Sequence, residues 1–480
     1  MFLAPDAVYR GLSARALEEW ERLLATRFFP AAIAAGHVVG SERVAPDDLP
    51  PDAAGRPWAA GLRHERIPFV SYPYEWCFSM LRDAAALQLQ LLAAALDEGM
   101  VLKDATPYNV QFRGARPVFI DVPSFVRLGP GEPWPGYRQF CELNLYPLFL
   151  QAYKGVEFHP WLRGRVDGIT PAQMRRLMSK RDLFRPGVLL HVWLHASMQG
   201  RHDATQRDVK QELAKAGFHA ELIKANVARL RKLVGKLAWK APKSEWSDYT
   251  DTNSYDEENR RRKHDFVRAV TTARPRSLVW DLGCNTGEYS RIAAESADQV
   301  VAMDGDHLAI DRLYRQLRDE GHETILPLVM NLSEASPGLG WRGSERQALE
   351  DRGRPDLVLC LALIHHMVIS SNIPMREFVG WLASLGGDLV IEFVGKDDAM
   401  VQTLLRNKED RDSDYEREPF EQALGEHFEI VRREELAGGA SSEGAAARGH
   451  GKSRRAALVP GNAGGAGASG RLRHGDDVLH

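Results

Sequence analysis

The sequence predicts an α/β protein built on a doubly wound, mostly parallel sheet that an α-rich region precedes. Short apolar runs alternate with segments of helical periodicity between residues 277 and 433, which is the order of a parallel sheet with crossover helices. The runs are continuously apolar rather than alternating, as in strands that are buried on both faces. A glycine-containing turn follows the first run, at the place where such sheets bind ligands.

Length and composition limit the class of protein. The 480 residues, of which 44% are hydrophobic and 26% charged, correspond to about three folding units. A formal net charge of -3 gives no general attraction to nucleic acids or anionic lipids. The four cysteines lie far apart with no C-x-x-C pair, so we expect neither a disulfide framework nor a metal site. The chain begins without a signal-like segment and has no apolar window long enough for a membrane span, so we expect a cytoplasmic protein.

Four stretches follow one another along the chain. We expect a first module, a helical region, a sheet domain that begins with the helix before its first strand, and a tail that is disordered because its glycine-rich composition buries little apolar surface. Their boundaries are 1–127, 128–245, 246–437 and 438–480.

The elements before the sheet are predicted to be mainly helices. Apolar spacing predicts helices over 14–24, 78–98 and 220–240, and Thr170 followed by Pro171 is typical of a helix start.

Six apolar segments are predicted to form the strands of the sheet. Helical segments over 288–297 and 308–320 connect the first three. No seventh strand is evident after the sixth, and in the tail only 456–459 has the composition of a strand. The six segments are SLVWD, QVVAMD, TILPLVM, DLVLCLAL, DLVIEFV and HFEIVRR.

The turn after the first strand carries the pattern D-x-G-x-x-x-G. Gly283 and Gly287 permit a tight turn and a close approach of a ligand. Cys284 and Asn285 lie between them, and asparagine tolerates a left-handed backbone better than most residues. A turn without a ligand would also fit this pattern taken alone.

A carboxylate follows at the end of the second strand. Asp304 lies 23 residues after Asp281, close to the distance at which Rossmann-like sheets place an acid that accepts the ribose hydroxyls. Asp281 would repel a pyrophosphate but suits the amino and sulfonium groups of S-adenosylmethionine. NAD therefore fits less well than S-adenosylmethionine.

These residues resemble the class I S-adenosylmethionine-dependent methyltransferases, over about 277–433. The resemblance implies S-adenosylmethionine as cofactor, with the glycine loop from Asp281 to Gly287 at its methionine end and Asp304 at its ribose. Asn331 and Leu332 fall where that family contacts adenine. The family's sheet usually ends with an antiparallel seventh strand, and this sequence departs from it there. The whole chain looks like a group of large bacterial methyltransferases of unassigned substrate.

Candidates for proton transfer follow the fourth and fifth strands. His365 and His366 lie at the carboxyl edge of the predicted sheet, and histidine titrates in a range useful to a general base. Glu392 on the fifth strand would orient such a base, or pair with a helix N-terminus. A structural role for each histidine stays open. Adjacent residues at a strand end point in different directions, so the two should not be equivalent, and we favour His366 slightly as the base.

Other polar patterns have simpler interpretations. The run from Arg260 to Lys263 is interpreted as a solvated helix face, and His191 and His195 as packing or polar contacts rather than metal ligands, because no third ligand is identifiable. Aromatic residues within 246–255 would close over the cofactor or pack as a surface turn.

A second resemblance covers about 69–125. Asp104, Asn109 five residues later, and Asp121 at the end of a strand resemble the catalytic and metal-binding loops of protein-kinase-like folds. No lysine occurs before Lys103 and no glycine-rich loop precedes it. We therefore interpret the module as a kinase-like remnant with a structural or a substrate-positioning role.

The sequence as a whole predicts a methyltransferase that acts on a hydroxyl or amine of a small molecule or glycan. DNA is not expected as a partner, since the N/D-P-P-Y/F signature is absent after the fourth strand, whereas RNA is not excluded. Two alternatives remain open, a scaffold or binding protein without turnover and a kinase-like phosphotransferase.

Overall fold

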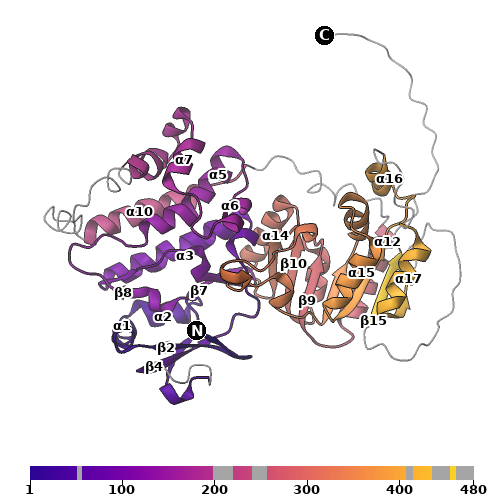
Figure 1. The fold of residues 1–480 in the computed structure, drawn as a ribbon, viewed down its shortest axis with the longest axis horizontal. Coiled ribbons are helices and arrows are strands. Elements are labelled where there is room, and N and C mark those ends of the chain that lie inside the picture. The colour runs from indigo at the N-terminus through magenta and orange to yellow at the C-terminus, as the bar shows by residue number, and fades with distance from the viewer. Residues whose placement is uncertain (51–56, 198–219, 241–256, 407–414, 435–454, 461–480) are drawn as a thin grey trace, which may run out of the picture. The chain divides into compact units, whose positions relative to one another are not determined.

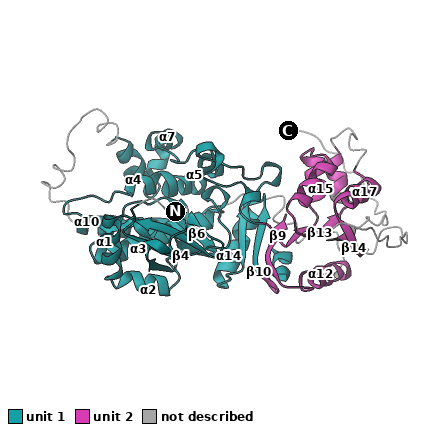
Figure 2. Ribbon diagram, turned by 60° about the horizontal axis from the view of Figure 1, so that its bottom comes forward, with its two compact units in different colours: residues 1–248, 284–294, 298–353 teal, residues 249–283, 295–297, 354–480 magenta. Residues whose placement is uncertain are grey.

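The computed structural model describes residues 1–50, 57–197, 220–240, 257–406, 415–434 and 455–460. Figure 1 shows the elements in chain order. The chain divides into two compact units, coloured separately in Figure 2. Unit 1 comprises 1–248, 284–294 and 298–353, and unit 2 comprises 249–283, 295–297 and 354–480.

Unit 1 begins with a four-stranded antiparallel sheet in the order β1-β2-β4-β3. Ser13 caps the first helix by accepting the N–H of Ala16, which satisfies a backbone donor that has no partner within the helix. The 20-residue helix α3 is apolar nearly all round and is buried accordingly. The elements are β1 (Phe2–Leu3), β2 (Ala7–Leu12), α1 (Ala14–Leu24), α2 (Phe28–Ala34), β3 (Ser41–Val44), β4 (Ala60–Glu65) and α3 (Phe78–Asp97).

Two short antiparallel pairs, β5 with β8 and β6 with β7, follow α3. A mainly helical stretch comes next, in which Thr170 caps α7 and Pro171 occupies its first position, as the sequence predicts. The elements are β5 (Met100–Leu102), β6 (Val110–Arg113), β7 (Arg116–Phe119), β8 (Phe125–Arg127), α4 (Tyr137–Phe140), α5 (Tyr146–Lys154), α6 (His159–Gly164), α7 (Pro171–Leu177) and α10 (Ala220–Lys236).

Unit 1 also contains part of the large sheet, and a buried ion pair joins this part to the N-terminal elements. Arg352 donates two hydrogen bonds to the Glu75 carboxylate, at 2.7 and 2.8 Å, and Ser336 donates a third. Asp311 on α14 accepts the N–H of Ser79 at the start of α3. The elements are α13 (Glu288–Ala294), β10 (Ala297–Asp304), α14 (His307–Asp319) and β11 (Ile325–Val329).

Unit 2 holds the rest of the large sheet and its helices. Its strands β9, β12 and β13 are almost wholly buried, which accounts for the continuous apolar runs of the sequence. The elements are α12 (Glu257–Thr271), β9 (Arg276–Leu282), β12 (Leu357–Cys360), α15 (Met375–Ser384), β13 (Asp388–Phe393), α16 (Ala399–Leu405), α17 (Arg417–His427), β14 (Glu429–Arg433) and β15 (Arg455–Pro460).

The large sheet has seven strands in the order β11-β10-β9-β12-β13-β15-β14. The pairings β10–β11, β9–β12, β12–β13, β13–β15 and β14–β15 are all parallel. The chain therefore has the Rossmann-like α/β fold that its sequence predicts.

The tail departs from the prediction at one place. Residues Arg455–Pro460 form β15 between β13 and β14, so the expectation of a tail without structure is wrong for these six residues. Ordering this segment costs conformational entropy. Pairing of β15 with β13 on one edge and β14 on the other, together with burial of Leu458, offsets that cost. The seventh strand is parallel, unlike the antiparallel one of the family that the sequence resembles.

We expect Leu458→Ala to lower the free energy of unfolding by about 2–4 kcal/mol, because a buried leucine is truncated between two strands. The control is Val431→Ala on the neighbouring strand β14, where the side chain is exposed and the change should stay within about 0.5 kcal/mol. Urea denaturation of both variants measures the difference. Equal effects of the two substitutions would show that β15 adds nothing to the sheet.

Candidate functional site

The glycine loop has a backbone that few residues adopt. Gly283, Asn285 and Gly287 have φ angles of +74°, +49° and +81°, all in the left-handed region. A Cβ at Gly287 would also lie 2.6 Å from the side chain of Leu313 on α14. The loop thus needs glycine at 287 for conformation and for space, and Asn285 supplies the left-handed residue that the sequence predicts.

Asp304 holds this loop through its carboxylate. Its Oδ2 accepts the N–H of Asn285 and its Oδ1 accepts the N–H of Asp306, each at 2.8 Å. Burial raises the pKa of the Asp304 carboxyl, and the two backbone donors act in the opposite direction. Each carboxylate oxygen can accept a second hydrogen bond, and no described residue supplies one. The carboxylate can therefore shape the loop and still accept two hydroxyl groups.

Asn331 lies at the same sheet edge as Asp304. Met330 donates its N–H to the carbonyl oxygen of Asp304 at 2.8 Å, and Asn331 is the next residue. The Oδ1 of Asn331 accepts the N–H and the Oγ–H of Ser333, so it caps a short helical turn that contains Leu332. This use of Oδ1 leaves the amide N–H groups of Asn331 as the part that could meet a purine edge.

The unit 2 candidates sit around the end of β12. Asp281 on β9 is buried, and its register partner is Leu359 on β12. His365 is buried and both of its ring nitrogens lack a hydrogen-bond partner among the described residues. The neighbouring His366 is half-buried and begins a π-helix, His366–Ser370, a form that is frequent at functional sites. The two rings lie 4.1 Å apart, centroid to centroid.

The two imidazoles are held in the neutral form. Burial, and after it the charges of His366 and Lys263, lowers the pKa of His365 to about 3. Burial alone lowers the pKa of His366 to about 4. A neutral imidazole has a free lone pair, which a general base requires.

Glu392 pairs with a lysine side chain. Its Oε2 accepts a hydrogen bond from Nζ of Lys263 on α12 at 2.7 Å, and both side chains are buried. The interpretation of residues 260–263 as a solvated face is therefore wrong for Lys263. The helical period shows why, since Lys263 shares the buried face of α12 with Asn259, Phe266 and Val267. That spacing was the available sequence signal.

The remaining patterns stand as follows. The hydroxyl of Tyr137 meets Nδ1 of His191 at 2.8 Å, and that of Tyr146 meets Nδ1 of His195 at 2.9 Å, which confirms polar contacts for both histidines. No group of three or more potential metal ligands gathers among the residues described. The aromatic residues at 246–255 lie outside the described residues.

The kinase-like pattern remains a prediction. Arg10 on β2 donates to Oδ1 of Asp121 at 2.7 Å, so a cation other than lysine faces this carboxylate. The Nδ2 of Asn109 is buried and has no hydrogen-bond partner in the described part of the chain.

The parallel sheet, the left-handed glycine loop and the acid at the end of β10 define a Rossmann-like α/β protein. The chain is 36% identical over 386 residues to the nodulation protein NoeA of Rhizobium meliloti (strain 1021), a match that spans 78% of this chain and 79% of that protein. It belongs to the NoeA family. No protein-family model matches it.

Solved structures match smaller parts of the chain. The N-methyltransferase NodS of Bradyrhizobium japonicum WM9 is 16% identical over 28% of this chain and 67% of its own, with a TM-score of 0.22. Monomeric WbdD is 18% identical over 35% and 38%, with a TM-score of 0.25. No conclusion about function follows from matches of this extent. Where the structure describes the chain, no helix has both the length and the apolar character to cross a bilayer.

We expect acid to destabilise unit 2 because folding keeps His365 and His366 neutral. The unfolded histidines titrate near pH 6.5 and the folded ones near 3 and 4. Their contribution is therefore complete above pH 6.5 and is lost as the pH falls toward 4, by up to about 1.4 kcal/mol per pH unit for each group.

Urea unfolding at a series of pH values measures this loss. His365→Leu should reduce the decline between pH 6.5 and 4, whereas His427→Leu, at an exposed position of α17, should leave it as in the unmodified protein. An equal decline in both variants would contradict a neutral, buried His365.

Proposed function

We propose that this protein is an S-adenosylmethionine-dependent methyltransferase. The observation that carries the proposal is the Asp304 carboxylate, which binds the glycine loop through the N–H of Asn285 and keeps unused acceptor capacity on both oxygens. A ribose presents two adjacent hydroxyl donors that match this capacity. The sequence pattern from Asp281 to Gly287 adds to this support.

The residues that would hold the donor follow from these features. Asp304 would accept the ribose hydroxyls, and Asn331 would offer its amide N–H groups to the purine edge beside Leu332. The backbone of Gly283, Cys284 and Gly287, with no large side chain at either glycine, would let the methionine part approach closely. The donor supplies a methyl group on a positively charged sulfur, which the carboxylate of Asp281 would favour electrostatically.

On the acceptor side, the histidines after β12 would take the proton. A hydroxyl releases a proton as it accepts a methyl group, and a protonated amine must lose a proton before its nitrogen can attack. In either case a neutral imidazole within hydrogen-bond reach accepts the proton. His366 is the more exposed of the pair, so we assign it this role. His365 and the Lys263–Glu392 pair lie deeper, where they would fix the orientation and the charge around it.

The acceptor class we propose is a hydroxyl or amine of a small molecule or glycan. Two other functions predict different binding and turnover. A scaffold that keeps the fold would bind the donor without turnover, whereas a phosphotransferase would bind nucleotide and magnesium and would lose both on substitution of Asp104 or Asp121.

The direct test is transfer of label from methyl-labelled donor into cell extract, with mass spectrometry of the product. We expect Asp304→Asn to weaken donor binding tenfold to a hundredfold in calorimetry, because hydrogen bonds to a charged acceptor contribute about 1.5–3 kcal/mol. Asp306→Asn is the matched control, since asparagine caps α14 as well as aspartate does. Unchanged affinity in Asp304→Asn would remove the ribose assignment.

His366→Ala should lower turnover about 100-fold with donor affinity kept, the usual scale for loss of a general base. His365→Ala should mainly lower stability. With a His366 pKa of about 4, activity should not fall on acidification until the pH approaches that value. The exposed His427→Ala serves as control. Near-normal turnover of both His365 and His366 variants from pH 6 to 9 would place the base elsewhere.

A further inference from the structure

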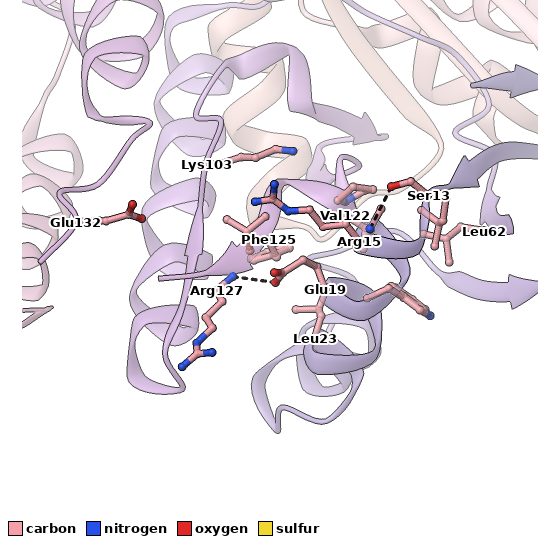
Figure 3. A pocket seen from close by; sticks show the side chains of 15 residues that line it. Ser13, Arg15, Glu19, Leu23, Leu62, Lys103, Val122, Phe125, Arg127 and Glu132 are labelled. Carbon is pink, nitrogen blue, oxygen red and sulfur yellow. Dashed lines mark hydrogen bonds between the residues drawn. The ribbon is translucent and has the colours of Figure 1, made fainter. Parts of the chain in front are cut away.

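A cavity in unit 1 lies apart from all the residues assigned above. Its volume is about 480 Å³, within the range of small-molecule sites. It is lined by the end of β2, by α1, by Leu62 on β4, and by residues around β5 and β8. Figure 3 shows these side chains around the hollow. Asp104, Asn109 and Asp121 do not line it, although their sequence neighbours Lys103 and Val122 do.

Basic side chains outnumber acidic ones in this lining. Arg15, Lys103 and Arg127 line the cavity, and none of them has an ion-pair partner within the described ranges. The acidic lining residues are Glu19 and Glu132. Glu19 accepts the backbone N–H of Arg127 at 3.0 Å and lies 3.7 Å from Arg22, and it forms no ion pair with any of the three cations within the described ranges.

Two of the three cations are directed to the same part of the cavity. In Figure 3 the charged ends of Arg15 and Lys103 extend toward one another, whereas the guanidinium of Arg127 points away from them. Like charges that approach each other repel, and an anion between them converts this repulsion into two attractive contacts. The arrangement therefore favours an anionic ligand.

A buried donor adds an independent observation. Trp20 lines the cavity and is only 4% exposed, yet its indole Nε1 has no acceptor among the described residues. An unsatisfied buried N–H costs free energy and is rare. A ligand rich in acceptor atoms would satisfy it, as it would the two cations.

The rest of the wall is apolar. Leu12, Leu23, Leu62, Val122 and Phe125 are all buried and line the same cavity. An inorganic ion would leave this surface without a contact, whereas a ligand with an apolar body would cover it.

We propose that this cavity binds a small organic phosphate. The phosphate group lies between Arg15 and Lys103, and the organic part packs against Leu23, Leu62 and Phe125 near the indole of Trp20. A phosphate ester with two negative charges matches two cations better than a carboxylate does. The site is independent of the donor site, and its occupant is a second ligand of the protein.

Calorimetry of the full chain with phenyl phosphate tests the proposal. We expect phenyl phosphate to bind at least tenfold more tightly than inorganic phosphate, which lacks the apolar body, and than benzoate, which carries one charge. Arg15→Met and Lys103→Met should each weaken phenyl phosphate about tenfold or more. Arg22→Met is the matched control, because Arg22 lies on the same helix but outside the lining, and it should bind as the unmodified protein does.

Trp20→Phe should weaken phenyl phosphate severalfold, since it removes the indole N–H together with the five-membered ring that forms part of the wall. Donor affinity should be unchanged in every variant, which separates this site from the proposed methyl transfer. Three results would overturn the proposal: no binding of phenyl phosphate, binding by the Arg15 and Lys103 variants as tight as that of the unmodified protein, or binding of benzoate as tight as that of phenyl phosphate.

Discussion

The Glu75–Arg352 ion pair is the contact on which unit 1 depends. Both side chains are almost completely buried, and Arg352 also donates to the carbonyl oxygen of Val70 and lies over the rings of Phe69 and Tyr72. A buried charge is stable only when its partners are complete, and removal of one partner typically costs about 3–5 kcal/mol. The pair joins the segment before α3 to the segment before β12, and it lies in the compact unit that contains the N-terminal elements and the strands β10 and β11.

The Asp304 side chain stabilises the local backbone and, in our proposal, also binds the ligand. Its two oxygens fix the backbone at Asn285 and Asp306, and the same oxygens face the position of a ribose in our proposal. Because a buried carboxylate without donors would be costly, the backbone N–H groups make an acid at this edge tolerable before any ligand arrives. The loop is thereby preorganised, and little ordering is left for the binding step.

Much of the fold could be predicted because local patterns dominate it. The helix over 14–24 has the predicted bounds and that over 78–98 ends one residue earlier, at Asp97, since apolar spacing and end signals act within a few residues. The partner of Lys263 and the strand β15 were missed for a different reason. Helical spacing indicates that Lys263 is buried, but its partner Glu392 is distant in sequence, as are the strands β13 and β14 that pair with β15. Composition alone favours an unstructured tail. The unpartnered nitrogens of His365 also depend on packing that no local pattern encodes.

The position of β15 determines the order in which the sheet can be completed. Synthesis proceeds from the N-terminus, and early segments can fold before late ones exist. Strands β13 and β14 emerge first, yet they have no pairing with each other in the finished sheet, and the strand that separates them follows both of them in the sequence. On the nascent chain the facing edges of β13 and β14 are therefore unpaired until β15 is available. The sheet can be completed only after β15 has been synthesised.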